Sequence, residues 1–600
     1  MGNYLNLIFK FIFLYNSKMD IEDMTFNINK YDNITKSFYE HYLKNTEYSF
    51  NKLLKIVMKE YSFKEKLNKI ILRKSYLNLV ENNICKLDSD FLKFLIKKPQ
   101  RSLSGIQSVS ILTSPYPKWI DEEGKEHVQK FSCKHNCYFC PNEIEDGKMI
   151  MPRSYLSREP ACLRASRNDF DPMEQIYDRL STLEMMGHPL DKIELIVLGG
   201  TVLEYPREYL TYFCIQCYYI CNIYPLKKGR KMLSLKEEQQ INETNKIKII
   251  GLTLETRPDG INYESIYFLR LLGVTRMQIG VQHTSNRLLS IVNRGHTIED
   301  SIDAIKLLKN SGFKIIAHLM PDLPYATKED DFEMFQKILD DPNLLCDEYK
   351  IYPTVATDYT VIKKWADKGK YTHNVDKDPY YLRDLIGYYM KHVQPWVRVP
   401  RIIRDIPNDY IHHGNKEGHL REIIDKEVDT SEIRGREIKD TKLTEYPVLV
   451  IDSFESSETK EYFIRYETKD RKNILGFCRL RLSDKSKNPF LPELYNCAII
   501  RELHVYGKTT LVNSKSGGIQ HLGLGKKLVK KAEWISLENG YTNMCITSGI
   551  GVREYYKNKL GYKLEGLYMK KNILFPVIQA FILGVSIFTI NLIYYYYYYT

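Results

Sequence analysis

The chain has 600 residues, 43% of them hydrophobic and 27% charged, and carries 87 Lys and Arg against 75 Asp and Glu, a net charge of +12. This length predicts about three or four domains of ~150 residues, and the composition allows each of them a sizeable core. The 12 cysteines follow no secretory signal, which excludes a disulfide-stapled secreted protein and indicates a reducing compartment.

The N-terminal region is basic, with lysine-rich stretches such as KLLKIVMKEYSFKEKLNKIILRK. Such charge suits a polyanionic partner, although it is equally typical of a soluble surface. The opening segment NYLNLIFKFIFLYN is short and interrupted by Lys10, so we do not interpret it as a leader, and Met19 is an alternative start.

Residues 133–140, CKHNCYFC, place Cys133, Cys137 and Cys140 close together. A structural zinc ion normally takes four protein ligands, and His135 lies too near the cysteines in sequence to complete the set. Three thiolates with one vacant position favour a 4Fe-4S cluster whose fourth iron is open to another ligand. A zinc knuckle or three unrelated cysteines are the alternatives.

Short apolar runs alternate with amphipathic stretches from residue 104 to about 354. The runs are typical of buried parallel strands, at 104–114, 192–201, 248–259, 276–282, 314–324 and 348–354. This rhythm predicts a partial parallel α/β barrel with its site at the carboxyl ends of the strands. Gly199 and Gly200 end one strand, where a ligand can approach the backbone closely. Glu255 ends the next, either as a ligand contact or in a network with Arg257.

Two further groups have less specific patterns. Cys214, Cys217 and Cys221 recur on one helix face and predict a buried surface. His412, His413 and His419 lie in a polar connector, residues 395–445, without ligand spacing. A linker or a phosphate-contacting surface is favoured there over a metal site.

From residue 446 the pattern changes to the alternation of antiparallel strands. Gln520, Gly523 and Gly525 then form Q-x-x-G-x-G before a helix that begins near Lys526, an arrangement that binds anions at the helix N-terminus. It lacks the G-x-G-x-x-G of a dinucleotide fold. With the preceding strand RELHVYG and the following helix REYYKNKLGYKLEG, it resembles the pyrophosphate loop of GNAT-type acetyltransferases.

The cysteine spacing resembles that of the radical S-adenosylmethionine (SAM) superfamily, in which SAM binds the open iron. A radical SAM domain followed by a GNAT domain resembles the catalytic subunits of the Elongator complex, which carboxymethylate the wobble uridine of tRNA. The likeness covers residues 97–571 and includes KKPQRSLSGI, DKIELIVLGGT, LTLETRPD, QIGVQ, NRGHT, AHLMPDLP and IRELHVYG. The chain departs from the pattern in the insert KWIDEEGKEHVQKF, a short first cysteine spacing and a C-terminal extension.

The resemblance implies an acyltransferase that uses a 4Fe-4S cluster, SAM and acetyl-CoA. A 5'-deoxyadenosyl radical would abstract hydrogen from the acetyl methyl group, the acetyl radical would add to C5 of uridine 34, and thioester hydrolysis would leave a carboxymethyl group. The implied partners are the tRNA anticodon loop, which basic residues such as Arg101 would contact, and Elongator-type subunits.

The resemblance also implies roles for individual residues. Cys133, Cys137 and Cys140 would bind the cluster, and Gly199 and Gly200 would meet SAM. Lys192 and Tyr556 would act in catalysis. The acetyl-CoA contacts would be Lys192, Glu502, Leu503, His504, Val505, Gln520, Gly523, Leu524, Gly525, Lys526 and Tyr556. The alternative is a GNAT protein (histone) lysine acetyltransferase with a structural iron–sulfur domain. A non-catalytic scaffold is disfavoured by the intact cysteine and CoA motifs.

The expected fold is thus α/β: a partial parallel radical SAM barrel, an α+β GNAT domain and a C-terminal transmembrane helix. The expected domains are 1–96, tRNA-binding; 97–394, radical SAM; 395–445, linker; 446–571, GNAT; and 573–593, a tail anchor. Residues 573–593 lack charge and as a helix would span about 32 Å. Lys570 and Lys571 orient the catalytic domains to the cytosol. The mitochondrial outer membrane is slightly favoured over the endoplasmic reticulum.

Overall fold

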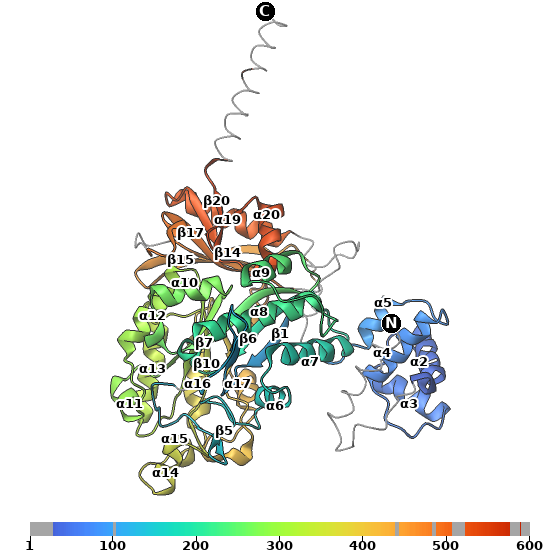
Figure 1. Cartoon of the computed structure of the whole chain (residues 1–600), viewed down its shortest axis with the longest axis horizontal. Helices are drawn as coiled ribbons and strands as arrows, with labels where there is room; N and C mark the ends of the chain where they lie inside the picture. Colours follow the sequence, from blue (N-terminus) through green and yellow to red (C-terminus); the bar gives the residue numbers. More distant parts are fainter. Residues whose placement is uncertain are drawn as a thin grey trace, which may run out of the picture.

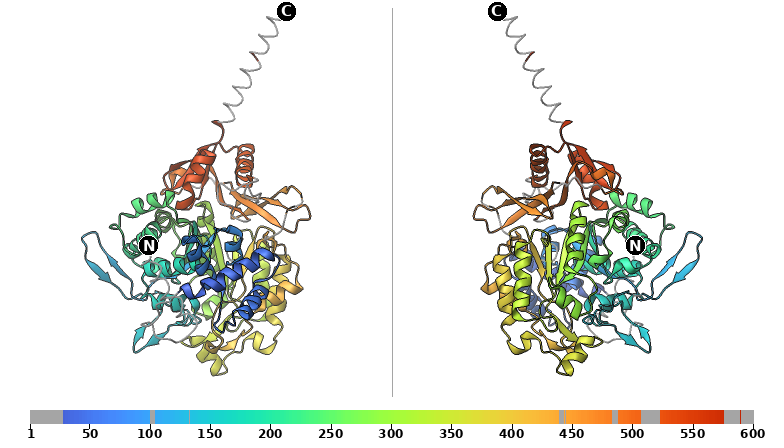
Figure 2. Two further views of the ribbon diagram at one scale, coloured as in Figure 1. Left: turned by 90° about the vertical axis from the view of Figure 1, so that its right-hand side faces the viewer. Right: turned by 90° about the vertical axis from the view of Figure 1, so that its left-hand side faces the viewer.

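The computed structural model describes residues 28–99, 104–131, 133–438, 443, 445–482, 488–506, 523–575 and 589. Within them the chain forms a lobe of N-terminal helices, a central α/β body and a C-terminal sheet with its own helices (Figure 1). The C-terminal sheet lies above the central body, and the N-terminal helices lie beside it, as the perpendicular views also show (Figure 2).

The central body contains a seven-stranded parallel sheet in the order β1-β6-β7-β8-β9-β10-β12. Its strands are β1 (Gln107–Leu112), β6 (Lys192–Leu198), β7 (Lys248–Thr256), β8 (Arg276–Gln282), β9 (Lys314–Leu319), β10 (Glu348–Ile351) and β12 (Arg398–Arg401). The principal helices that connect the strands are α6 (Pro160–Arg167), α7 (Pro172–Met185), α8 (Arg207–Ile223), α9 (Leu235–Thr244), α10 (Tyr263–Leu271), α12 (Ile298–Asn310), α13 (Lys328–Asp340) and α16 (Tyr381–His392). The predicted partial parallel barrel is confirmed.

The two faces of each strand have different roles. On β6, Ile193, Leu195 and Val197 are at most 1% exposed and join the main hydrophobic core. The alternate residues, Glu194 and Leu198 among them, line an internal cavity. Side chains of a strand alternate between its faces, so one face packs against the helices while the other is free to carry polar groups into the barrel.

Strand β12 lies inside the segment for which we expected a linker. It pairs with β10 and completes the sheet. Its sequence, RVPR, has two arginines and a proline in four residues, so it lacks the apolar run that identifies the other strands. The same segment holds β13 (Ile411–Gly414), which pairs with β11 (Val355–Thr357), and helix α17 (Leu420–Glu427).

The C-terminal sheet has the order β14-β15-β16-β17-β18-β20-β19. Its pairs are antiparallel except for β17 and β18, which run parallel. The elements are β14 (Val448–Ser456), β15 (Thr459–Glu467), β16 (Ile474–Arg481), β17 (Cys497–Val505), α19 (Leu524–Glu538), β18 (Asn543–Ile546), α20 (Arg553–Leu560), β19 (Lys563–Glu565) and β20 (Tyr568–Asn572). Leu524, Leu528 and Ala532 on α19 pack onto the sheet and form part of a hydrophobic core that is separate from that of the barrel.

The N-terminal lobe contains α2 (Asp32–Lys44), α3 (Phe50–Glu60), α4 (Lys69–Glu81) and α5 (Ser89–Phe94). Phe38, Leu72 and Phe91 form the centre of its separate hydrophobic core. Asn68 and Asp88 cap the N-termini of α4 and α5 with their side chains, which satisfies otherwise free backbone N–H groups.

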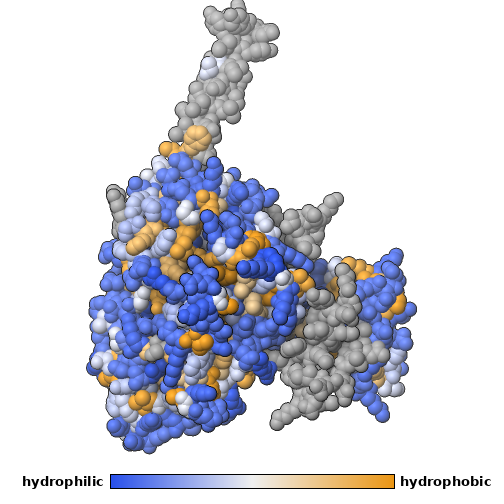
Figure 3. Space-filling model, viewed as in Figure 1, coloured by the Kyte–Doolittle hydropathy of each residue, from blue (hydrophilic) through white to orange (hydrophobic). Residues whose placement is uncertain are grey.

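The expected membrane-spanning helix at 573–593, and with it the tail-anchored localisation, is corrected. In the part of the chain that the structure describes, no helix combines the length and apolarity needed to cross a bilayer. The apolar segment begins as part of the C-terminal sheet: Ile573 is 3% exposed and its N–H donates to the Thr542 carbonyl. Apart from residues 573–575 and 589, the segment lies outside the described residues. On the face seen in Figure 3, hydrophilic residues predominate and hydrophobic ones form separate small patches.

Candidate active site

The cysteine loop contributes Cys133, Cys137 and Cys140 to the wall of one cavity. The Cys133 sulfur lies 3.8 Å from Thr201 Oγ1, directly after the glycines that end β6. Burial, followed by the neighbouring Cys137, raises the pKa of Cys140 to about 11. The three predicted cluster ligands therefore lie together at the carboxyl end of the barrel.

Two buried arginines face the sulfur of Cys137. Arg257 Nη1 lies 3.6 Å from it and Arg294 Nη1 lies 3.5 Å from it. Arg257 is held by Asp259, whereas Arg294 donates to the Gly280 carbonyl. The two guanidinium groups would balance the negative charge of a cluster bound through this sulfur. The sequence indicates Arg257 only as a possible partner of Glu255, and the motif NRGHT contains Arg294 without indicating its role.

These residues fit a 4Fe-4S cluster. Three cysteines and two guanidinium groups provide thiolate ligands and counter-charge for an anionic group. His135 does not join them, because its Nε2 lies 3.1 Å from Asp259 Oδ2. Among the described residues, no three His, Cys, Asp or Glu side chains are gathered around the position of a single metal ion.

Glu255 organises the glycine-rich end of β6. Its Oε1 accepts hydrogen bonds from the backbone N–H groups of Gly199, at 2.8 Å, and Gly200, at 2.5 Å, and from the Tyr155 hydroxyl. Neither of our two interpretations of Glu255 included this contact. A Cβ on Gly199 would stand 2.3 Å from Thr113 Oγ1, and Gly200 has a φ of +75°, so both positions require glycine.

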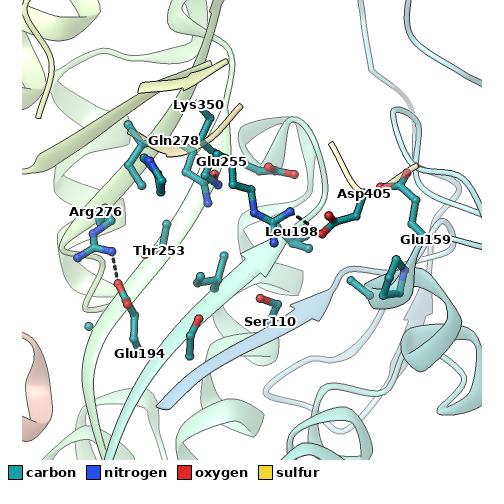
Figure 4. Close-up of a pocket in the computed structure, with 18 of the residues that line it drawn as sticks. Ser110, Glu159, Glu194, Leu198, Thr253, Glu255, Arg276, Gln278, Lys350 and Asp405 are labelled. Atoms are coloured by element: carbon teal, nitrogen blue, oxygen red, sulfur yellow. Dashed lines mark hydrogen bonds and ion pairs between the residues drawn. The ribbon is translucent and has the colours of Figure 1, made fainter. Parts of the chain in front are cut away.

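A cavity of about 1530 Å³ runs through the barrel. Its wall includes the three cysteines at one end and, at the other, Glu502, Leu503, His504 and Tyr556 of the C-terminal sheet region. Figure 4 shows inward side chains between these ends, among them Glu194, Arg276, Gln278 and Lys350, with the ion pair of Arg276 and Glu194 drawn as a dashed line. One cavity thus joins the predicted cluster site to the predicted acetyl-CoA site.

Charged side chains join the C-terminal sheet to the barrel at the acetyl-CoA end of this cavity. Lys314 on β9 contacts Glu348 on β10 at 2.6 Å and Glu502 on β17 at 2.5 Å. Glu502 also accepts from Arg479 Nε at 2.9 Å. These cations outweigh burial and lower the pKa of Glu502 to about 2. The side chain of Glu502 therefore ties the C-terminal sheet to the barrel, a role that lies beyond our expectation of a backbone contact to acetyl-CoA.

The remaining predicted acetyl-CoA residues have different surroundings. Val505 and Gly525 lie close together, since a Cβ on Gly525 would meet Val505 Cγ2 at 3.7 Å. Leu524 is fully buried in the core, and Gly523 starts α19 with a φ of +65°. Gln520, like Arg101, lies outside the described residues. Burial lowers the pKa of His504 to about 4, and Tyr556, whose pKa burial raises, lines the cavity with it.

Lys192 is not brought to the cavity wall. It is half-buried at the start of β6, paired in register with Lys248, at the end of the strand opposite to the cysteines.

The second group of cysteines and the three histidines of residues 395–445 lie apart from the cavity. The helix face with Cys214, Cys217 and Cys221 is at most 2% exposed on α8, as predicted. The three histidines have separate carboxylate partners: His412 with Asp358, His413 with Asp367 and His419 with Glu422.

Two known protein-family patterns match the chain. The Radical SAM superfamily matches residues 131–338, and the Radical_SAM C-terminal domain matches residues 346–430. The second match includes β12, β13 and α17.

Individual relatives match most of the chain. The tRNA uridine(34) acetyltransferase of Methanocaldococcus infernus is 37% identical over 80% of this chain and 88% of its own length. Elongator complex protein 3 of Homo sapiens is 34% identical over 79% of this chain and 85% of its own. The solved structure of archaeal Methanocaldococcus infernus Elp3 with an N-terminal deletion aligns with 78% of this chain and 99% of that one, with a TM-score of 0.63 and 32% identity.

Proposed function

Because the chain belongs to the family of Elongator complex protein 3 and tRNA uridine(34) acetyltransferases, we propose that it forms the carboxymethyl group at C5 of the wobble uridine of tRNA. It is an acyltransferase with a radical SAM domain. The single observation that carries the proposal is the continuous cavity from the three cysteines to His504 and Tyr556. A cluster and an acetyl thioester bound at its two ends would face the same enclosed space.

The cofactors would supply the bond-making chemistry: cluster and SAM a radical, and acetyl-CoA the two-carbon unit. The chain itself binds and orients them. Cys133, Cys137 and Cys140 would hold the cluster, and Arg257 and Arg294 would balance its charge. The barrel wall would limit the access of water to the reacting groups, which protects a reactive species from side reactions.

At the other end, the backbone of β17 and the N-terminus of α19 would hold acetyl-CoA. The first N–H groups of any helix have no partner within the helix, and the positive end of the helix dipole favours a pyrophosphate there. A Cβ on Gly525 would come within 3.0 Å of the Tyr555 hydroxyl and 3.7 Å of Val505 Cγ2, so glycine keeps this narrow space clear. The buried hydroxyl of Tyr556, neutral because burial raises its pKa, would donate to the thioester sulfur.

The N-terminal lobe is our proposed tRNA-binding region. The cavity opens between this lobe and helices α6 and α7, where Lys66, Lys97, Lys98 and Arg164 line it. Cations on both sides of an opening suit the phosphates of an RNA that places one base inside. The names of the relatives support a further proposal, that the chain acts with Elongator-type partner subunits.

The test is a reconstituted reaction with tRNA, SAM and acetyl-CoA under reducing, anaerobic conditions. We expect 5-carboxymethyluridine at position 34 only when both SAM and acetyl-CoA are present. Acetylation of a histone peptide with no change in tRNA would favour the lysine acetyltransferase alternative instead.

A further inference from the structure

Lys350 is a cation inside the barrel without a carboxylate partner among the described residues. Its one hydrogen bond there joins its Nζ to the neutral amide oxygen of Gln278, Oε1, at 2.5 Å. The two nearest carboxylates are engaged elsewhere: Glu255 with the glycine N–H groups and Glu348 with Lys314. Lys350 is half-buried in the cavity wall. A partly buried charge without a counter-ion is costly, so such a group commonly marks a ligand site.

The side chain of Lys350 has a fixed position. Gln278, 1% exposed, also lies 2.9 Å through Oε1 from His318 Nε2. Burial lowers the pKa of His318 well below its usual value, so its ring is neutral and can donate through Nε2. Two donors converge on one amide oxygen, which fixes the orientation of the amide and places the ammonium group beside it.

Along the barrel axis, Lys350 lies between the end of the cavity with the three cysteines and the end where we expect acetyl-CoA. Glu348 and Lys350 both point into the cavity from β10, and Tyr352 follows at the strand end. Two residues along a strand advance about 6.6 Å. Glu348 belongs to the layer that Lys314 connects to Glu502, whereas Tyr352 and Glu255 belong to the layer of the cysteine loop. A base that reacts with groups from both ends must lie at this level. Figure 4 shows Lys350 next to Gln278 and Glu255, with Thr253 farther away.

We propose that Lys350 donates a hydrogen bond to O4 of the target uracil and so selects uridine and directs its C5 into the middle of the cavity. The proposal rests on the proposed function. Uracil carries a carbonyl oxygen at position 4, where cytosine carries an amino group. A cationic donor binds the oxygen and repels the amino group. C4 is bonded to C5, so this contact also orients the reacting carbon. Gln278 and His318 act as positioning residues.

The test uses the full-length protein with its cluster and an anticodon stem-loop RNA that carries uridine, 4-thiouridine or 2-thiouridine at the target position. We expect Lys350→Met to lower carboxymethylation of uridine on the order of 10- to 100-fold, the range for a hydrogen bond to a charged group. Lys350→Arg, which keeps a cationic donor, should recover part of the rate. Lys337→Met on the exposed face of α13 is the matched control.

The thio-substituted RNAs separate this contact from others. Sulfur is a weaker hydrogen-bond acceptor than oxygen, so the unaltered protein should modify 4-thiouridine more slowly than uridine. The Lys350→Met protein, which lacks the donor, should modify both at the same rate. If 4-thiouridine lowers the rate equally in the unaltered protein and in Lys350→Met, or if only 2-thiouridine lowers the rate, the proposed contact with O4 is wrong. If Lys350→Met instead raises the KM for SAM or for acetyl-CoA, the cation binds a cofactor and the proposal is wrong. Failure of the unaltered protein to modify uridine would reject the proposed function itself, and thermal unfolding shows whether each variant is folded.

Discussion

At the scale of single residues, the geometry of the site depends on side chains that are absent as much as on those present. Gly199 is the clearest case, because Thr113 Oγ1 occupies the space where its Cβ would be. The Thr113 hydroxyl in turn donates to Tyr205. The end of β6 therefore packs closely against the end of β1, and the N–H groups of Gly199 and Gly200 donate to Glu255.

Gly199→Ala should displace this strand end, because a contact of 2.3 Å is impossible without movement. We expect a loss of about 1–3 kcal/mol in stability, typical of overpacking, and a marked loss of SAM cleavage. The double variant Gly199→Ala with Thr113→Ala removes the clash and should recover part of both. If the double variant is as impaired as the single one, steric pressure from Thr113 is not the reason for the glycine.

The three cysteines and the two glycines could be singled out from the sequence because they lie in short motifs, and the structure places them at one end of the barrel. The arginines that face Cys137 could not: Arg294 lies 157 residues from Cys137 in the chain, and only the fold brings them together. The same holds for Lys314, whose contact with Glu502 spans 188 residues.

At the scale of elements, apolar strands were predictable and polar ones were not. Strand β6 has an apolar run and was recognised, whereas β12, with RVPR, was assigned to a linker. Strand β10 combines both features, since its outward residues Tyr349 and Ile351 are buried in the core while Lys350 points into the cavity. Its pattern indicates a strand and does not reveal the chemistry of its inner face.

Burial, with the nearby cation Arg401, lowers the pKa of Lys350 to about 8 from the usual 10.5 of a lysine, against the opposing effect of the carboxylates Glu255 and Glu348. Below pH 8 Lys350 is charged in the folded protein, so the full desolvation cost of its charge lowers the free energy of unfolding. Between about pH 8 and 10.5 the unfolded chain binds more protons than the folded one, so stability rises with pH.

We therefore expect Lys350→Met to be more stable than the unaltered protein at pH 7, with a difference that shrinks as the pH rises from 8 to 10.5. Thermal unfolding of both proteins across this range, at one scan rate, measures the difference. A constant difference would show that Lys350 keeps an ordinary pKa in the folded state.

At the scale of the whole molecule, a buried ionic cluster fixes the C-terminal sheet on the barrel. Arg501 on β17 contacts Asp347 at 2.6 Å and Glu461 at 2.7 Å, and all three side chains are at most 2% exposed. Arg501 and neighbouring cations lower the pKa of Glu461 to about 2, against burial. This cluster holds the two ends of the shared cavity in one geometry.

Arg501→Met should destabilise the protein by about 3–5 kcal/mol, because it leaves buried carboxylates without their cation. We expect proteolysis between the barrel and the C-terminal sheet to become faster. Arg383→Met, which removes an exposed pair with Glu427, is the control and should change little. Equal susceptibility of the two variants would contradict a special role for the buried cluster.

The central claim is that both cofactor sites of one chain serve the same cavity. Cys137→Ala removes a cluster ligand and leaves the acetyl-CoA site intact, while Gly525→Glu places bulk and negative charge where we expect the pyrophosphate and leaves the cluster intact. The decisive measurement mixes these two inactive proteins in equal amounts with tRNA, SAM and acetyl-CoA and measures 5-carboxymethyluridine. We predict no product above that of either variant alone, because neither chain has both sites facing one cavity. Product at a substantial fraction of the unaltered protein's rate would show that the two half-reactions occur in separate chains, and would contradict the account.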